Sequence, residues 1–309
     1  LQAARAAAPG FAVTAENEGD IRRICNLLQG MPLAIEIAGR WIRLADCATI
    51  ANEIAQSLEM LVSPLVDLPD RHRSMAAVFA HSWGMLTAAE QILLARLSVF
   101  RGPFSLSTAL SVLECTVKDV AALLDKSLVQ RTAGGRYVLH ELLRQFAAAR
   151  LDDIREPANL YAETRQRHST FYLQKVAEQE TRLAGPNPRR SAALIQERIG
   201  NIRHAWQWAV EHNQLEPINR SLDGYARYHE YAGLIGDGLA LVDETLADLR
   251  AHNRPMPAPA APFLLVQSFL LIWKAHFADR LGRSNDAIGY AEESVALAQQ
   301  AQDAYGIAR

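Results

Sequence analysis

The sequence predicts a mainly α protein with one small β-hairpin and a C-terminal α-solenoid of helical repeats. Helical periodicity with capping residues recurs along most of the chain. One β-branched stretch surrounds Ala133-Gly134-Gly135. Small residues recur at equal spacing in the C-terminal half. The length alone allows about two or three domains, at about 100–200 residues each, and we expect three, at 1–67, 68–150 and 151–309.

The first domain should contain a pair of helices separated by glycine and proline. Ile21, Ile24, Cys25 and Leu28 form one helical stripe. Gly30 can end that helix and Pro32 suits the first turn of the next. The second helix should present apolar residues on one face, namely Ala34, Ile37, Ala38, Trp41 and Ala45.

Residues 68–150 should form a winged helix. Capping boxes at Thr87-Ala88-Ala89-Glu90 and Thr116-Val117-Lys118-Asp119 predict two helix starts. Leu128–Thr132 and Arg136–His140 flank the glycine turn and predict a hairpin. Helical periodicity resumes after Glu141, so His140 should lie at the strand-to-helix junction, near a helix N-terminus that favours an anion.

The C-terminal half should be a stack of helix pairs. Gly233, Gly238 and Thr245 have the same spacing as Gly282, Ala287 and Ser294, and Ser268–Ala301 has the length of one repeat of about 34 residues. The proline-rich segment Arg254–Pro262 should be a stiff linker between repeats. Trp208 falls off the apolar stripe of its helix, as expected where a repeat packs on two neighbours.

Several motifs together resemble a known family. They are Gly30-Met31-Pro32, Leu68–Met75, His81–Trp83, Leu97–Phe100, Lys126–Val129, Leu139–Ala147 and the helix at Glu197–His212. This set resembles STAND NTPases of the NB-ARC type with tetratricopeptide repeats, and the resemblance covers nearly the whole chain.

The resemblance implies a nucleotide switch in the intact protein. His140 matches the histidine that contacts the β-phosphate of ADP, although the triplet here is Leu139-His140-Glu141. Gly30 and Pro32 match the motif beside the adenine. The residues alone leave another interpretation open, in which His140 only caps a helix or bonds to a backbone carbonyl. In the same way, one aromatic cluster could either line a groove or form the core between helices; its members are Tyr225, Tyr228, His229 and Tyr231.

The chain lacks the residues needed for hydrolysis of ATP. No G-x-x-x-x-G-K-[ST] loop occurs, nor an apolar strand that ends in paired acids. We therefore expect a fragment that is not an enzyme by itself and binds no cofactor alone, with ADP or ATP and Mg²⁺ held by the intact protein. Three separated cysteines and the absence of a signal sequence or a long apolar span predict a cytoplasmic protein without a metal site or a membrane.

Two functions remain open. In the first, the chain is the regulatory and sensor arm of the switch: the winged helix holds the ADP-bound closed state, and the repeats bind an inducer or an inhibitory partner. Further partners would be the nucleotide-binding domain of the same protein and other copies after activation. In the alternative, the winged helix binds DNA and the repeats mediate interactions. The net charge of −2 and the balance of two lysines and two aspartates in Val117–Lys126 disfavour DNA binding.

Overall fold

The computed structural model describes residues 2–28, 32–43, 45–56, 75–154, 159–252 and 261–301, and it confirms a mainly α fold with one small hairpin. The chain divides into two compact units, Leu1–Thr164 and Arg165–Arg309. The division falls inside α11 (Leu160–Ala177). All but Met75 of the predicted motif at 68–75 lies outside the described residues, as does the predicted linker at 254–262 except for its last two residues, which begin α17.

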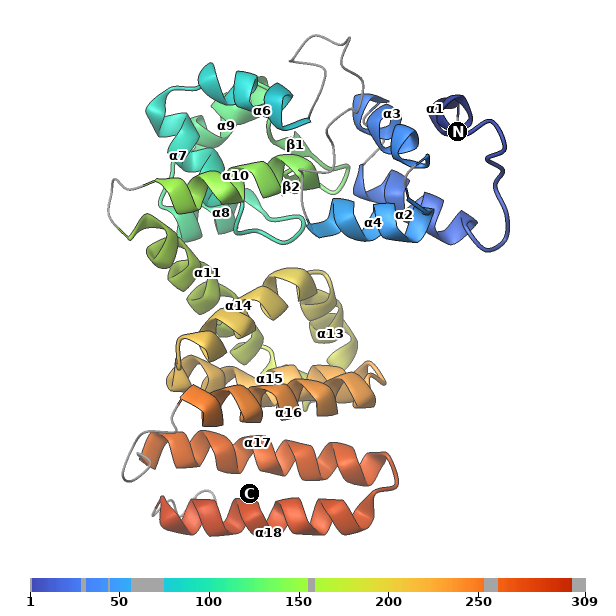
Figure 1. Ribbon diagram of the computed structural model, residues 1–309. Helices are drawn as coiled ribbons and strands as arrows, with labels where there is room; N and C mark the ends of the chain where they lie inside the picture. The colour runs from blue at the N-terminus through green and yellow to red at the C-terminus, as the bar shows by residue number, and fades with distance from the viewer. Residues whose placement is uncertain are drawn as a thin grey trace. The chain divides into compact units, whose positions relative to one another are not determined.

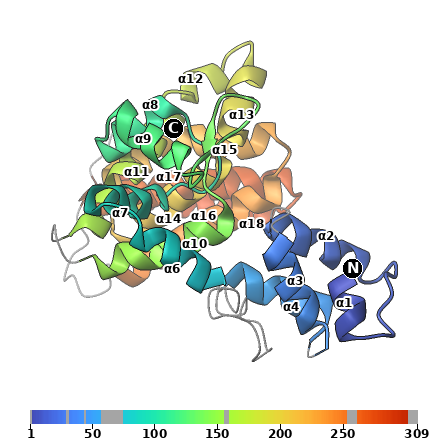
Figure 2. The same cartoon turned by 90° about the horizontal axis from the view of Figure 1, so that it is seen from above.

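The first unit begins with four helices that gather into one group in both views (Figures 1 and 2): α1 (Gln2–Ala7), α2 (Glu18–Leu27), α3 (Pro32–Trp41) and α4 (Cys47–Gln56). α1 packs on α3, and α2 packs on α4. Of the stripe predicted on α2, Leu28 is fully buried and Ile21 and Ile24 are half-buried, whereas Cys25 is exposed. One expectation was wrong: α3 ends at Trp41, so Ala45 lies beyond the helix, where its N–H bonds to the Trp41 carbonyl.

The winged helix follows with the elements α6 (Met75–Gly84), α7 (Ala88–Leu97), α8 (Leu106–Leu113), α9 (Val117–Asp125), β1 (Gln130–Arg131), β2 (Tyr137–Val138) and α10 (Glu141–Asp153). Both predicted capping boxes are present, at Thr87 with Glu90 and at Thr116 with Asp119. Each cap satisfies helix N–H groups that have no partner within the helix, which explains why α7 and α9 start there.

The hairpin is antiparallel, with Gln130 opposite Val138. Its strands are shorter than predicted because the Val129 N–H bonds back to the Leu123 carbonyl in α9. A further bridge, which no sequence pattern predicted, pairs Phe104, a residue before α8, with Tyr137 of β2. Gly135 makes the turn with a φ of +73°, a conformation that suits glycine.

The second unit contains the remainder of α11 and α12 (Glu180–Leu183), α13 (Pro188–Gln196), α14 (Ile199–Glu211), α15 (Leu215–Tyr231), α16 (Ile235–His252), α17 (Ala261–Arg280) and α18 (Ser284–Gln300). In Figure 1, α15 to α18 lie across the view as successive layers. Gly233 and Gly282, with φ of +72° and +77°, turn the chain between α15 and α16 and between α17 and α18. The equal spacing of small residues in the sequence therefore reflects two equivalent turns between paired helices.

The small residues predicted between the helices do permit close approach. A Cβ added to Gly238 would lie 2.7 Å from Cζ of Phe277 in the next helix pair. The Ser294 hydroxyl donates to the Ser268 carbonyl at 2.9 Å, so α17 and α18 touch through their backbones and short side chains. Trp208 is buried, and its Nε1 donates to Oε1 of Gln166 in α11 at 3.4 Å, in agreement with a helix that packs on two faces.

Helix α17 is long and apolar enough to cross a membrane by length and composition, although the sequence interpretation judged its apolar run too short. In the structure, 61% of its most apolar window is buried against other helices. Core helices of globular domains have this character, and α17 packs between α16 and α18.

Candidate functional site

His140 lies between the winged helix and the end of α2. It is the N-cap of α10, and its side chain is 8% exposed. The Leu142 N–H donates to Nδ1 at 3.2 Å, and Nε2 lies 3.0 Å from the Leu28 carbonyl oxygen. The histidine thus takes part in both contacts that the residues alone left open, the cap and a bond to a carbonyl.

These two bonds determine the tautomer of His140. Because Nδ1 accepts from Leu142, Nε2 must carry the hydrogen that is donated to Leu28. The ring is therefore neutral and offers one N–H. Burial lowers its pKa, and the Leu28 carbonyl and Glu141 only partly oppose this effect.

The contact brings His140 to the end of α2, which lies close in sequence to the predicted Gly30-Met31-Pro32 motif. Leu28 is the C-cap residue of α2, two residues before Gly30, and α3 begins at Pro32. Gly30 itself lies outside the described residues, and nothing is said of the Pro32 side chain. The contact itself joins His140 and Leu28, which are 112 residues apart in sequence.

Glu141 is tied into its own helix. Its carboxylate accepts from Nη2 and Nε of Arg144 at 2.7 and 2.9 Å and from Nε2 of Gln145 at 3.1 Å. Burial by itself would raise the pKa of Glu141, but the bonds from Arg144 and Gln145 outweigh it and lower the pKa. Glu141 is thus ionised, and its bonds to Arg144 and Gln145 lie within the first turns of α10.

Helix α9, the candidate DNA-reading helix, offers little positive charge. Lys126 bonds to both oxygens of Glu90, at 2.6 and 2.7 Å, and Asp119 is used in the cap with Thr116. Val117, at the start of the helix, is 55% exposed. Lys118 is exposed, but the exposed side of α9 also carries Asp119 and Asp125. This face is poorly suited to a phosphate backbone.

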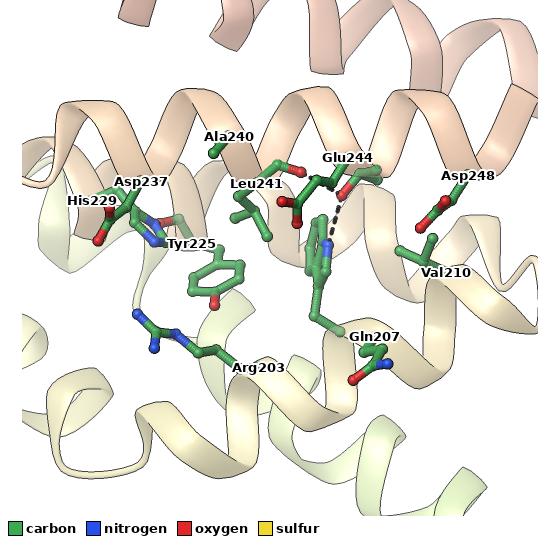
Figure 3. Close-up of a pocket in the computed structure, with 12 residues that line it drawn as sticks. Arg203, Gln207, Val210, Tyr225, His229, Asp237, Ala240, Leu241, Glu244 and Asp248 are labelled. Atoms are coloured by element: carbon green, nitrogen blue, oxygen red, sulfur yellow. Dashed lines mark hydrogen bonds between the residues drawn. The ribbon is translucent and has the colours of Figure 1, made fainter. Parts of the chain in front are cut away.

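A second candidate site is a groove in the repeats, with a volume of about 630 Å³. Figure 3 shows α16 as one wall and α14 as the other, with Tyr225 and His229 of α15 between them. Its lining residues are Arg203, Trp206, Gln207, Val210, Tyr225, His229, Asp237, Ala240, Leu241, Glu244, Thr245 and Asp248. Nε1 of Trp206 donates to Thr245 at 2.9 Å and thereby joins the two walls.

The aromatic cluster predicted around Tyr225 serves both as core and as groove. Tyr225, Tyr228 and His229 are at most 2% exposed, while Tyr231 is 44% exposed and points away from the core. Tyr225 and His229 also line the groove. Burial raises the pKa of Tyr225 to about 12 despite its bond to Arg203, so the phenol stays neutral.

Comparison with known proteins gives relatives but no family. No family model matches the chain. It is 28% identical over 322 aligned residues to proteins of Mycobacterium bovis and Mycobacterium tuberculosis named "Putative HTH-type transcriptional regulator", and this alignment covers 97% of the chain and 34% of the relatives. The chain therefore spans about a third of the length of these relatives. An uncharacterized protein of M. tuberculosis is 27% identical over 175 residues, 53% of this chain and 44% of its own length.

Among solved structures, the chain is similar to a STAND protein with a tetratricopeptide repeat sensor from Pyrococcus horikoshii. The sequence identity is 16%, the TM-score is 0.34, and the match covers 98% of this chain and 41% of the other.

The sequence analysis missed two features of the sites. The Leu28 carbonyl is a backbone group, and no residue type reports its use as an acceptor. The acidic wall of the groove was also missed, although Asp237, Glu244 and Asp248 lie seven and four residues apart, and this spacing places them on one face of a helix.

Proposed function

We propose that this chain is the regulatory and sensor arm of a signal-transduction ATPase whose output is transcription. In the intact protein, the winged helix would hold the ADP-bound closed state through His140, and the groove of the repeats would bind an inducer or an inhibitory partner. The similarity to HTH-type regulators supports a transcriptional output. The nucleotide-binding and DNA-binding segments would lie in parts of the intact protein outside this chain.

The observation that supports this proposal best is the bond between His140 and the end of α2. It holds the winged helix against the segment that leads into Gly30-Met31-Pro32. A histidine that only capped α10 would need Nδ1 alone. Here the second nitrogen also donates, to the Leu28 carbonyl at the end of α2, two residues before Gly30 in the sequence.

The test is release of a fluorescent ADP analogue from the intact protein. A phosphate bond to His140 is worth about 1.5–3 kcal/mol and would replace a neutral bond to Leu28 worth about 0.5–1.5 kcal/mol. The net loss in His140→Ala is therefore about 1 kcal/mol, or roughly fivefold faster release. His276→Ala is the matched control, since His276 is half-exposed and pairs with Glu230 in the repeats. Equal release rates in wild type and His140→Ala would refute the role of this histidine.

The second candidate is a winged-helix DNA-binding regulator with a tetratricopeptide interaction domain, and the names of the relatives favour it. It requires that Lys118 contact a phosphate, because Lys126 is paired with Glu90. A footprint on DNA that persists at physiological salt and is lost in Lys118→Ala would establish this function in place of the first.

A further inference from the structure

A second cavity in the repeats lies where α12 meets α13, and it shares no lining residue with the groove between α14 and α16. Its volume is about 540 Å³, which is large enough for a small molecule. α12 packs on α13, and Figure 2 shows the two helices next to each other. Arg182 belongs to α12, Gly185-Pro186-Asn187 to the connection, and Arg190 and Ser191 to α13. We call this site the α12–α13 cavity.

The α12–α13 cavity is positively charged. Arg182 and Arg190 both line it, and no aspartate or glutamate is found among its described lining residues. Within the described part of the chain, neither arginine is found in an ion pair. Both side chains are exposed, so a ligand that enters from solvent can reach them. Guanidinium groups bind phosphates and carboxylates through two parallel N–H···O bonds, so an anionic ligand suits this pair.

The start of α13 adds to the positive potential. Asn187 is the N-cap of this helix but makes no side-chain cap bond, and the first turn contains no acid. Arg189 and Arg190 lie in that turn instead, at the end of the helix where the dipole disfavours cations. A bound anion would neutralise these charges and accept from N–H groups of the first turn that have no partner within the helix.

Gln179 gives the same cavity a buried polar atom without a partner. The residue lines the cavity and is 5% exposed, and its Oε1 is buried with no hydrogen-bond partner. Such an acceptor costs free energy until a donor reaches it. The last torsion of glutamine is soft, so the carboxamide can turn Oε1 towards the cavity. Gln179 therefore indicates, independently of the arginines, a ligand that carries an O–H or N–H donor.

From these observations we propose that the α12–α13 cavity binds a small phosphate monoester that also carries hydroxyl groups. The phosphate would bind Arg182, Arg190 and the first N–H groups of α13, and a hydroxyl of the same molecule would donate to Oε1 of Gln179. A phosphate monoester has a charge of about −1.5 to −2 at neutral pH, which matches two arginines better than one carboxylate does. The site is separate from the groove proposed for the inducer, so this inference goes beyond the proposed function.

The test is isothermal titration calorimetry of this chain at physiological ionic strength. The probes are glucose 6-phosphate and glycerol 3-phosphate, with inorganic phosphate, gluconate and glucose for comparison. We expect saturable binding of the two esters and none of glucose. Inorganic phosphate should bind about fivefold more weakly than the esters, because it carries no hydroxyl group beyond the phosphate itself. Gluconate, with hydroxyl groups but a single carboxylate, should also bind more weakly than the esters.

Two double variants test the arginines. Arg182→Gln/Arg190→Gln should weaken binding of the esters and of inorganic phosphate by about tenfold or more, because it removes charge-assisted bonds. Arg220→Gln/Arg280→Gln is the matched control, since it removes the same charge from exposed positions outside the cavity. The control should bind as wild type does. Circular dichroism of each variant separates lost binding from lost folding.

Gln179→Met tests the second part of the proposal. Methionine has a similar length but only a weak acceptor, so the esters should lose about fivefold in affinity while inorganic phosphate binds as before. Because Oε1 has no partner in the free chain, the same substitution should not lower the urea midpoint of unfolding.

Several results would overturn the proposal. They are no binding of either ester, binding of glucose or gluconate as tight as that of the esters, and an equal loss of affinity in the control double variant. If inorganic phosphate and the esters bound equally and Gln179→Met changed neither, the cavity would hold an adventitious ion only, and the proposal would be wrong. Release of ADP from the intact protein depends on His140 in the first unit, so either proposal can fail without the other.

Discussion

The two hydrogen bonds of His140 predict how strongly this residue stabilises the first unit. His140→Ala removes the N-cap of α10, at a cost of about 1 kcal/mol, and the bond to the Leu28 carbonyl, at about 0.5–1.5 kcal/mol. We therefore expect a loss of about 1.5–2.5 kcal/mol in the free energy of unfolding. Asparagine is a good N-cap but is too short to reach Leu28, so His140→Asn should recover about 1 kcal/mol of this loss.

Hydrogen exchange measured by mass spectrometry, in a series of urea concentrations, can follow each unit separately. Peptides from α10 report on the first unit, and peptides from α16 serve as an internal control in the second. The expected order of protection in α10 is wild type, then His140→Asn, then His140→Ala, with α16 unchanged. Unchanged protection of α10 in His140→Ala would refute the contribution of both bonds, and equal loss in the two variants would refute the contribution of the cap.

Further predictions concern pH, packing, nucleotide and DNA. Because burial depresses the pKa of folded His140, the unfolded state binds more protons below about pH 6.5. The stability that neutral His140 contributes is thus present above that pH and is lost as pH falls through the folded pKa. Urea unfolding midpoints measured from pH 8 to pH 5 should therefore fall more steeply in wild type than in His140→Asn. Gly224→Ala should destabilise the second unit by about 1–2 kcal/mol, because the added Cβ would lie 2.7 Å from the Val176 carbonyl oxygen. Gly289→Ala should stabilise the same unit by up to about 1 kcal/mol, because an added Cβ would meet nothing within 4 Å and alanine is the better helix former. Urea unfolding followed by tryptophan fluorescence compares the two variants. Calorimetry of the chain alone with ATP or ADP and Mg²⁺ should show neither hydrolysis nor micromolar binding, and steady phosphate release would contradict this expectation. Gel shifts with unrelated DNA sequences should be indistinguishable and disappear in moderate salt.

The local features of the fold were predictable because their causes are local. Thr87 and Thr116 lie three residues from the acids that complete their capping boxes, so four residues contain the whole interaction. Gly233 and Gly282 adopt a positive φ in the turns between paired helices. Each glycine is followed by small residues at the same spacing, which can be recognised in the sequence. The end of α3 was misplaced because an apolar residue at helical spacing, Ala45, does not show whether the backbone still continues the helix.

The features of the sites depend on contacts between distant segments, and the sequence does not encode them in one place. The partner of His140 is a carbonyl 112 residues away. The two walls of the groove are joined by a hydrogen bond between Trp206 of α14 and Thr245 of α16, which are 39 residues apart in sequence. Sequence reasoning identified His140, Tyr225 and His229 as chemically capable residues; only the structure shows what each of them faces.

The Leu28 contact has a consequence for how a switch of this kind would operate. Nε2 of His140 carries one hydrogen, so the Leu28 carbonyl and a nucleotide phosphate would compete for it. In such a switch the winged helix would be held against α2 even without nucleotide, and ADP would add only the difference between the two bonds. A ligand shifts an equilibrium only by its differential affinity for the two states. Loss of ADP alone would therefore leave much of the closed state populated, and the inducer bound to the repeats would have to supply the remaining free energy for opening.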